Sequence, residues 1–135
     1  VDNRNPFHVA AGLGDLKLVK RLLKEGYEIN QPDSFGATPL LIAMVAGQEE
    51  MVDFLLARNA NPTLTAKDGY TLMHGAAFSG KKSMVRKALS LGLKVNSRYG
   101  EDGITPADVA EDEGDALPYL RAMGGRTAWE LGPHH

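Results

Sequence analysis

The feature that most constrains the fold of this chain of 135 residues is an internal repeat. A dipeptide typical of a helix start recurs at intervals of 33, 33 and 34 residues, at Asn5-Pro6, Thr38-Pro39, Thr71-Leu72 and Thr105-Pro106. The same three intervals separate four glycines, which are Gly14, Gly47, Gly80 and Gly114. An apolar quartet follows the first three glycines and begins at Leu18, Met51 and Met84. Separate features that share one period indicate a chain made of stacked, equivalent units.

Each unit has the local chemistry of two short helices. A threonine or asparagine before proline caps a helix start, because its side chain accepts a hydrogen bond from an early backbone N–H and proline suits the first turn. The four glycines are expected to end the first helix in the left-handed conformation that glycine adopts at least cost. The quartet that follows places apolar residues at i, i+1, i+4 and i+5, which is one stripe of a second helix. We expect this second helix to end at Gly26, Asn59 and Gly92.

No unit of this size can bury both of its faces, so the core must form between stacked neighbours. Turn-rich stretches separate the units and predict protruding hairpin loops, for example at 67–69 and 99–103. The last unit is degenerate. Its first helix is expected to include Glu111, Asp112 and Glu113, and its second to span Leu117–Met123. A tail at 127–131 is expected to fold back over the exposed end.

These features resemble the ankyrin repeat. The resemblance rests on Gly36-x-Thr38-Pro39-Leu40, on Gly69-x-Thr71-Leu72-Met73-His74 and on Gly103-x-Thr105-Pro106, and it covers roughly residues 5–124. It implies an all-α fold, a helical solenoid of ankyrin-type helix–turn–helix repeats joined by hairpin-like loops. Leu41 and Asp108 replace the motif histidine, and the 34-residue interval implies one extra residue in the Tyr99–Gly103 tip.

The resemblance also divides the chain. We expect an ankyrin repeat domain at 1–125, with repeats at about 5–32, 33–65, 66–98 and 99–125, followed by a C-terminal tail at 126–135. We interpret His134-His135 as native residues or the remnant of a purification tag. The start at Val1 is interpreted as an excised domain or a processed terminus.

The function that the resemblance implies is the binding of a protein partner through hairpin tips and the concave face of the first helices. Transferred position by position, the partner-binding residues are Ser34, Phe35, Ala37, Val45, Ala46, Lys67, Asp68, Tyr70, Phe78, Ser79, Arg98, Tyr99, Glu101 and Asp102, with Ile104 continuing the row. Four are aromatic, and large rings beside an arginine are enriched in interface hot spots. We expect these four rings to be exposed in one contiguous patch. The alternative is that they lie flat on neighbouring loops and stiffen the hairpins.

Catalytic chemistry finds no support in the sequence. The chain has no cysteine, and no phosphate loop, dinucleotide fingerprint or nucleophile elbow appears. His8 and His74 occupy the motif position of two units, and we interpret them as hydrogen-bonding loop groups rather than a metal. The acidic residues between 101 and 115 are interpreted as a solvated capping face. We therefore predict no enzyme activity, no cofactor and no metal site.

The distribution of charged residues leaves partners other than proteins as alternatives. A basic band without an intervening acid comprises Lys81, Lys82, Arg86, Lys87, Lys94 and Arg98. We interpret it as a solubilising surface, with nucleic acid or another anionic ligand as the alternative. The net charge of −2 does not favour nucleic acid, and no apolar run is long enough to insert into a membrane. A regulatory or positioning domain of a larger protein is a further alternative. We expect a monomer in the cytoplasm, with a secreted or periplasmic location as alternatives.

Overall fold

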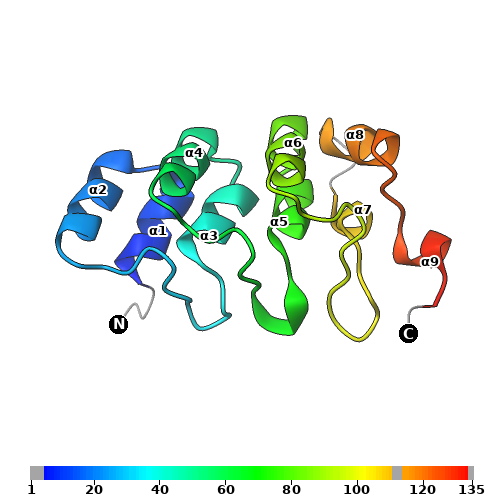
Figure 1. Cartoon of the computed structure of the whole chain (residues 1–135), viewed down its shortest axis with the longest axis horizontal. Helices are drawn as coiled ribbons and strands as arrows, with labels where there is room; N and C mark the ends of the chain where they lie inside the picture. The colour runs from blue at the N-terminus through cyan, green and yellow to red at the C-terminus, as the bar shows by residue number, and fades with distance from the viewer. Residues whose placement is uncertain (1–4, 111–113, 134–135) are drawn as a thin grey trace.

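The computed structural model describes residues 5–110 and 114–133. Within these ranges the chain forms successive helix pairs and a final short helix (Figure 1). The pairs are α1 (Pro6–Leu13) with α2 (Leu16–Lys24), α3 (Pro39–Val45) with α4 (Glu49–Ala57), α5 (Leu72–Phe78) with α6 (Lys82–Ser90), and α7 (Pro106–Val109) with α8 (Ala116–Ala122). A 3-10 turn, η1 (Lys67–Gly69), lies in a hairpin tip, and α9 (Ala128–Leu131) comes last. The same ranges contain no strand, which confirms the predicted all-α helical solenoid.

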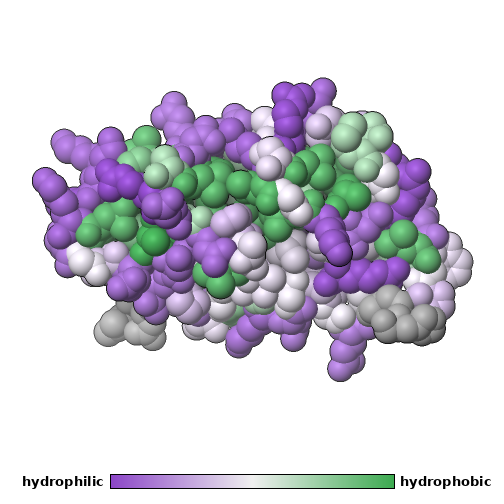
Figure 2. All heavy atoms as spheres, viewed as in Figure 1, coloured by the Kyte–Doolittle hydropathy of each residue, from purple (hydrophilic) through white to green (hydrophobic). Residues whose placement is uncertain are grey.

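The pairs stack side by side along the long axis, with the hairpin loops along one edge of the molecule (Figure 1). One continuous core runs through the stack. Its fully buried large side chains come from every pair and include Phe7, Met44, Met51, Leu55, Met73, Met84 and Leu120. On the face seen in Figure 2, hydrophobic residues form a band across the middle, bordered by hydrophilic ones. None of the described helices is both long and apolar enough to span a bilayer.

The predicted helix starts are confirmed by their hydrogen bonds. Asn5 Oδ1 accepts from the backbone N–H of Phe7 at 2.8 Å, and Thr38 Oγ1 accepts from that of Leu41 at 3.2 Å. Reciprocal capping boxes, in which the side chain of the third helical residue also reaches back to the cap, occur at Thr71, Thr105 and Thr127. These bonds satisfy N–H groups that a helix start leaves without partners.

Most of the predicted helix ends are confirmed as well. Gly14, Gly47 and Gly80 follow the first helices with positive φ angles of 76°, 71° and 76°. After the second helices the left-handed positions are Gly26, Asn59 and Gly92. The next backbone N–H then turns back into the helix, as Ala60 does to the carbonyl of Leu55 at 3.0 Å. This is the capping motif expected for a glycine or asparagine end.

The prediction for Gly114 was wrong. Its φ angle is not in the left-handed region, and α7 already ends at Val109. Gly114 instead lies against Gly80, so that a Cβ at position 114 would overlap the Gly80 carbonyl. The backbone N–H of Ala116 donates to the same carbonyl at 3.2 Å. Glycine is therefore needed here for close approach of two backbones, and the predicted helical residues 111–113 lie outside the described ranges.

Backbone hydrogen bonds join the hairpin tips of successive units. The N–H of Lys67 donates to the carbonyl of Phe35 at 3.0 Å, and that of Gly100 to the carbonyl of Asp68 at 2.9 Å. Within the tips, Asp33 pairs with Ala37 and Ala66 with Tyr70, whereas Tyr99 pairs with Ile104 one position further on. The extra residue predicted for the last tip is thus confirmed. The tips form one ordered row because each is fixed by its neighbour.

The tail folds back on the last unit, as expected. Thr105 Oγ1 donates to the carbonyl of Arg126 at 2.7 Å, and the N–H of Ala128 donates to Asp108 Oδ2 at 3.0 Å. Glu130 accepts from the N–H of Thr127 and from Arg121, which together lower the pKa of its carboxyl group to about 2. Trp129 remains 92% exposed, so its ring covers none of the core.

Candidate functional site

The first helices of the first three pairs expose an uncharged surface. The sequences of α1, α3 and α5 contain no Asp, Glu, Lys or Arg. The side chains in these helices, or directly after them, that are not fully buried are mostly apolar. We call this surface the first-helix face, and it consists of Val9, Leu13, Ile42, Val45, Ala46 and Phe78. An apolar face without charges needs no desolvation of ionised groups when another surface covers it. It is therefore suited to binding a partner by burial of apolar area.

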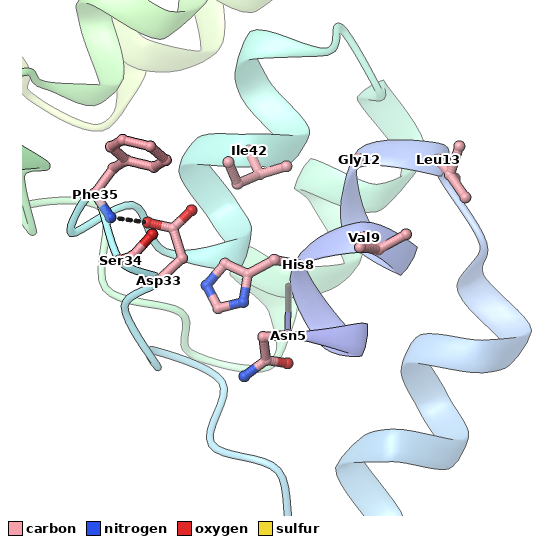
Figure 3. A pocket seen from close by; sticks show the side chains of 9 residues that line it. All are labelled: Asn5, His8, Val9, Gly12, Leu13, Asp33, Ser34, Phe35 and Ile42. Atoms are coloured by element: carbon pink, nitrogen blue, oxygen red, sulfur yellow. Dashed lines mark hydrogen bonds between the residues drawn. The ribbon is translucent and has the colours of Figure 1, made fainter. Parts of the chain in front are cut away.

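A groove lies at the N-terminal end of the first-helix face (Figure 3). Val9, Gly12 and Leu13 of α1 form one wall, and the tip at 33–35 forms the other, with Ile42 between them. The groove encloses about 600 Å³, and we call it the α1 groove. Leu13 is 72% exposed and Phe35 69% exposed, although both are large and apolar. Large apolar side chains exposed at the mouth of a groove are typical of a surface that is stabilised when another molecule covers it.

His8 lies at the inner side of the α1 groove, buried and 5% exposed. Its Nε2 bonds the carbonyl oxygen of Ala37 at 2.9 Å, which braces the first hairpin tip against α1. Its Nδ1 is buried without a hydrogen-bond partner. In Figure 3 the imidazole ring lies between Asn5 and the turn of Asp33 and Ser34.

His74 occupies the equivalent position in α5, and both of its ring nitrogens are bonded. Nδ1 lies 2.8 Å from Thr71 Oγ1, and Nε2 lies 2.7 Å from the carbonyl oxygen of Ile104. The interpretation that both histidines hydrogen-bond loop groups is confirmed. Burial lowers the pKa of His74, opposed by hydrogen bonds to the backbone of Ile104 and Ser97. In α3 the position is Leu41, which provides no such brace.

The expectation of four exposed rings is correct for two of them. Phe35 and Phe78 are exposed. Tyr70 and Tyr99 are half-buried and pack against His74, with ring centroids 5.2 Å and 4.8 Å from the imidazole and 4.9 Å from each other. Burial, and secondarily the neighbouring Tyr99, raises the pKa of Tyr70 to about 12. Two successive hairpin tips thus close over the motif histidine, so these tyrosines are partly structural.

The other predicted binding residues differ in exposure. Ala37 is only 7% exposed, because it pairs with Asp33 inside the tip and its carbonyl meets His8, so little of its side chain is available to a partner. The exposed members are Ser34, Ala46, Lys67, Asp68, Glu101 and Asp102. Val45, Ser79, Arg98 and Ile104 are half-buried. Arg98 also donates to the carbonyl of Gly132 at 3.1 Å, which ties it to the tail.

Sequence reasoning missed the α1 wall of the groove. A signal was present, because subtracting the period of 33 from Val45 and Ala46 gives Gly12 and Leu13. The transfer of binding positions began at the second unit and therefore omitted the first. Val9 and Ile42, one period apart, were missed for a different reason: each looks like an ordinary core residue in a helix whose residues are almost all apolar.

The basic band is partly engaged in links between units. Lys81 Nζ donates to the carbonyl of Gly47 at 2.8 Å, and Lys87 forms an ion pair with Asp53 at 2.9 Å. Lys82 and Arg86 lie over the ring of Tyr119. Four of the six basic residues therefore make contacts with a neighbouring unit of the stack. Of the acidic residues, Asp108 and Asp115 cap backbone N–H groups, while 111–113 lie outside the described ranges.

Comparison with known proteins agrees with this geometry. A family described as ankyrin repeats (3 copies) matches residues 7–99. The chain is 36% identical over 102 residues to the inactive serine/threonine-protein kinase TEX14 of Bos taurus, covering 74% of this chain and 7% of that protein. It is 35% identical over 89 residues to the phosphocholine transferase AnkX of Legionella pneumophila, covering 65% of this chain and 9% of that protein. It is 33% identical over 104 residues to the human transient receptor potential cation channel subfamily A member 1, covering 75% of this chain and 9% of that protein.

Proposed function

This chain belongs to the ankyrin repeat family, and from that premise we propose that it binds a protein partner through the first-helix face and the adjoining hairpin tips. Ankyrin repeats are in general modules for protein–protein interaction rather than catalysis. The single observation that carries the proposal is the uncharged first-helix face, which includes the exposed ring of Phe78 and is flanked by the exposed ring of Phe35. Aromatic residues on a rigid support are the usual anchors of interfaces.

The ordered tips add the polar rim that such an interface needs. Ser34, Lys67 and Asp68 are exposed beside Phe35, and Lys67 Nζ lies 5.9 Å from the Phe35 ring centroid. An apolar centre surrounded by polar groups excludes water from the anchors and sets the orientation of the partner. Because backbone bonds hold each tip to the next, little conformational entropy is lost when a partner binds.

Replacing Phe35 and Phe78 together by serine is expected to weaken partner binding by at least about 30-fold, the effect of losing hot-spot anchors. Affinity capture from a lysate of the source organism identifies the partner, and its affinity is then measured by calorimetry with the purified domain. Tyr27→Ser is the matched control, since Tyr27 is an exposed ring outside this face. The melting temperature of each variant is measured alongside, and equal affinity of both variants would contradict the proposal.

Tyr70 is unsuitable for this test because of its contact with His74. A Tyr70→Ala variant would unpack the imidazole and confuse loss of binding with loss of structure. Phe35 and Phe78 avoid this difficulty, since both are exposed.

A second candidate is a positioning domain that binds another part of its own protein. The observation that favours it is the small share of each relative that the chain covers, 7% to 9% in the three named above. In such proteins the repeat region is one part of a much larger whole. A longer native product whose remaining segment binds the purified domain in trans, and competes with other partners, is the expected result. Absence of that binding would leave the intermolecular proposal alone.

A further inference from the structure

Basic side chains from two successive units surround one hollow on the side of the second helices. We call it the α2 hollow. It encloses about 560 Å³ and is lined by Lys20, Arg21, Leu23 and Lys24 of α2 and by Arg58, the residue that follows α4. Its four basic residues are all exposed, and no described residue of the lining is acidic. Like charges that converge on one space repel each other, so this arrangement favours an anion between them.

The ring of Phe54 holds two of these cations in place. Phe54 is half-buried and packs against the core. Its ring centroid lies 5.6 Å from Lys20 Nζ and 4.8 Å from Arg58 Cζ, so one fixed ring attracts a cation from each unit. A guanidinium placed over an aromatic ring keeps the N–H groups of its edge free to donate. The two side chains are therefore partly ordered before an anion arrives, which lowers the entropy cost of binding.

The positive charge of the α2 hollow is only partly balanced within the chain. Arg21 forms an ion pair with Glu25, with 3.5 Å between Nε and Oε2. Lys24 ends α2 and Arg58 caps α4, and each helix C-terminus carries about half a negative charge. Lys20, Lys24 and Arg58 form no ion pair with another described residue. Glu25 and the two helix ends thus offset about two of the four positive charges and leave about two.

A phosphate monoester matches the charge that remains. Such a group carries a charge of about −1.5 to −2 at neutral pH and has three acceptor oxygens on one phosphorus atom. A carboxylate carries a single negative charge, so two carboxylates would have to enter the same space. Nucleobases bind proteins by stacking on open aromatic faces, and the ring beside this hollow already attracts two cations. The net charge of −2 also disfavours a long polyanion.

We propose that the α2 hollow binds a phosphate monoester group. Arg58 donates hydrogen bonds to the phosphate oxygens from the edge of its guanidinium, and Lys20 and Lys24 supply further positive charge. The residues of this site lie outside the first-helix face, so the site is separate from the one proposed for the protein partner. The phosphate belongs to a small phosphorylated molecule or to a phosphorylated side chain, and these two sources share the chemistry that the hollow recognises.

The direct probe is N-acetyl-phosphoserine methylamide, in which the phosphate is the only charged group. Titration of the nitrogen-15-labelled domain at constant ionic strength is expected to give saturable NMR shifts at the backbone N–H groups around the hollow, including those of Leu23 and Arg58. The same compound without phosphate is expected to give none. Arg58→Gln is expected to weaken binding about tenfold, because a charge-assisted hydrogen bond is lost. Lys17→Gln is the matched control, since it removes an equal charge from an exposed position of α2 outside the hollow.

Phe54→Leu separates a built site from a general positive field. The variant keeps every charge and an apolar side chain against the core, but it removes the ring that orders Lys20 and Arg58. We expect binding about threefold weaker than in wild type, which corresponds to the loss of an exposed cation–π contact. A general field would leave the affinity of this variant unchanged. The melting temperature of each variant is measured alongside, so that loss of binding is compared only among folded proteins.

The outcomes decide the proposal and its source. Absence of saturable shifts at millimolar phosphoserine compound overturns it, as do equal losses for Lys17→Gln and Arg58→Gln. A short DNA duplex that binds more tightly than the phosphoserine compound and is weakened equally by both variants would indicate a diffuse field for polyanions and also overturn it. A phosphoserine peptide that binds more tightly than the small compound assigns the group to a protein, whereas equal affinities assign it to a small molecule, and both results support the site. The capture experiment with Phe35 and Phe78 is independent of all these results.

Discussion

Gly114→Ala is expected to lower the free energy of unfolding by about 3 kcal/mol, the upper range for forcing extra atoms into a packed site. The added Cβ would overlap the backbone carbonyl of Gly80, which cannot rotate aside as a side chain can. Gly80 is itself held in the left-handed conformation, and its carbonyl accepts from the N–H of Ala116. Separating the two backbones therefore pulls α8 away from α6.

Urea unfolding followed by circular dichroism measures this effect. Gly12→Ala is the matched control, because its Cβ would meet only the Cγ2 of Ile42 at 3.1 Å, a side-chain atom that has room to move. Within a helix that exchange favours stability by up to roughly 1 kcal/mol. If Gly114→Ala proved as stable as wild type, the close approach of 80 and 114 would not be a constraint.

His74→Ala is expected to cost about 3 kcal/mol or more, since it leaves buried partners unsatisfied and opens a cavity. The imidazole is fully buried, bridges Thr71 to the carbonyl of Ile104 and supports the rings of Tyr70 and Tyr99. His8→Ala removes one such bond, to Ala37, and is expected to cost roughly half as much. Equal losses for the two variants would show that the tyrosine cluster adds nothing.

His74 also predicts a dependence of stability on pH. Its pKa in the folded chain lies below 6.5, the ordinary value for the unfolded chain. As pH falls below 6.5 the unfolded chain takes up a proton that the folded chain binds more weakly, so the free energy of unfolding decreases. The contribution is fully present above that pH. Urea unfolding at about pH 7.5 and about pH 5.5 is expected to show a drop for wild type that is smaller for His74→Ala.

Local signals explain why so much of the fold was predictable. The Thr-Pro starts and the glycine or asparagine ends act through hydrogen bonds within a few residues, and a period of 33 fixed their positions. The prediction for Gly114 was wrong because the role of this residue depends on Gly80, a residue in the preceding unit. No local rule distinguishes a glycine needed for a turn from one needed for close approach.

The candidate site was predictable only in part, for a similar reason. The exposure of Phe35 and Phe78 could be predicted from the repeat, because the hairpin tips and the outward side of the first helices occupy fixed places in it. The burial of Ala37 and the packing of Tyr70 on His74 are tertiary contacts between residues of different elements. The unsatisfied Nδ1 of His8 results from the lack of a hydrogen-bonding group beside it in the fold, which no sequence pattern predicts.

The leucine at position 41 has a mechanical consequence for the whole stack. Imidazole braces join the first unit to the second and the third to the fourth, but none spans the middle. There the long, flexible side chains of Lys81 and Lys87 reach across to Gly47 and Asp53. The seam between the second and third units lacks an imidazole brace and is linked by the tip bond from Lys67 to Phe35 and by these lysines. We expect bending to concentrate at this seam when the curvature adjusts to a bound surface.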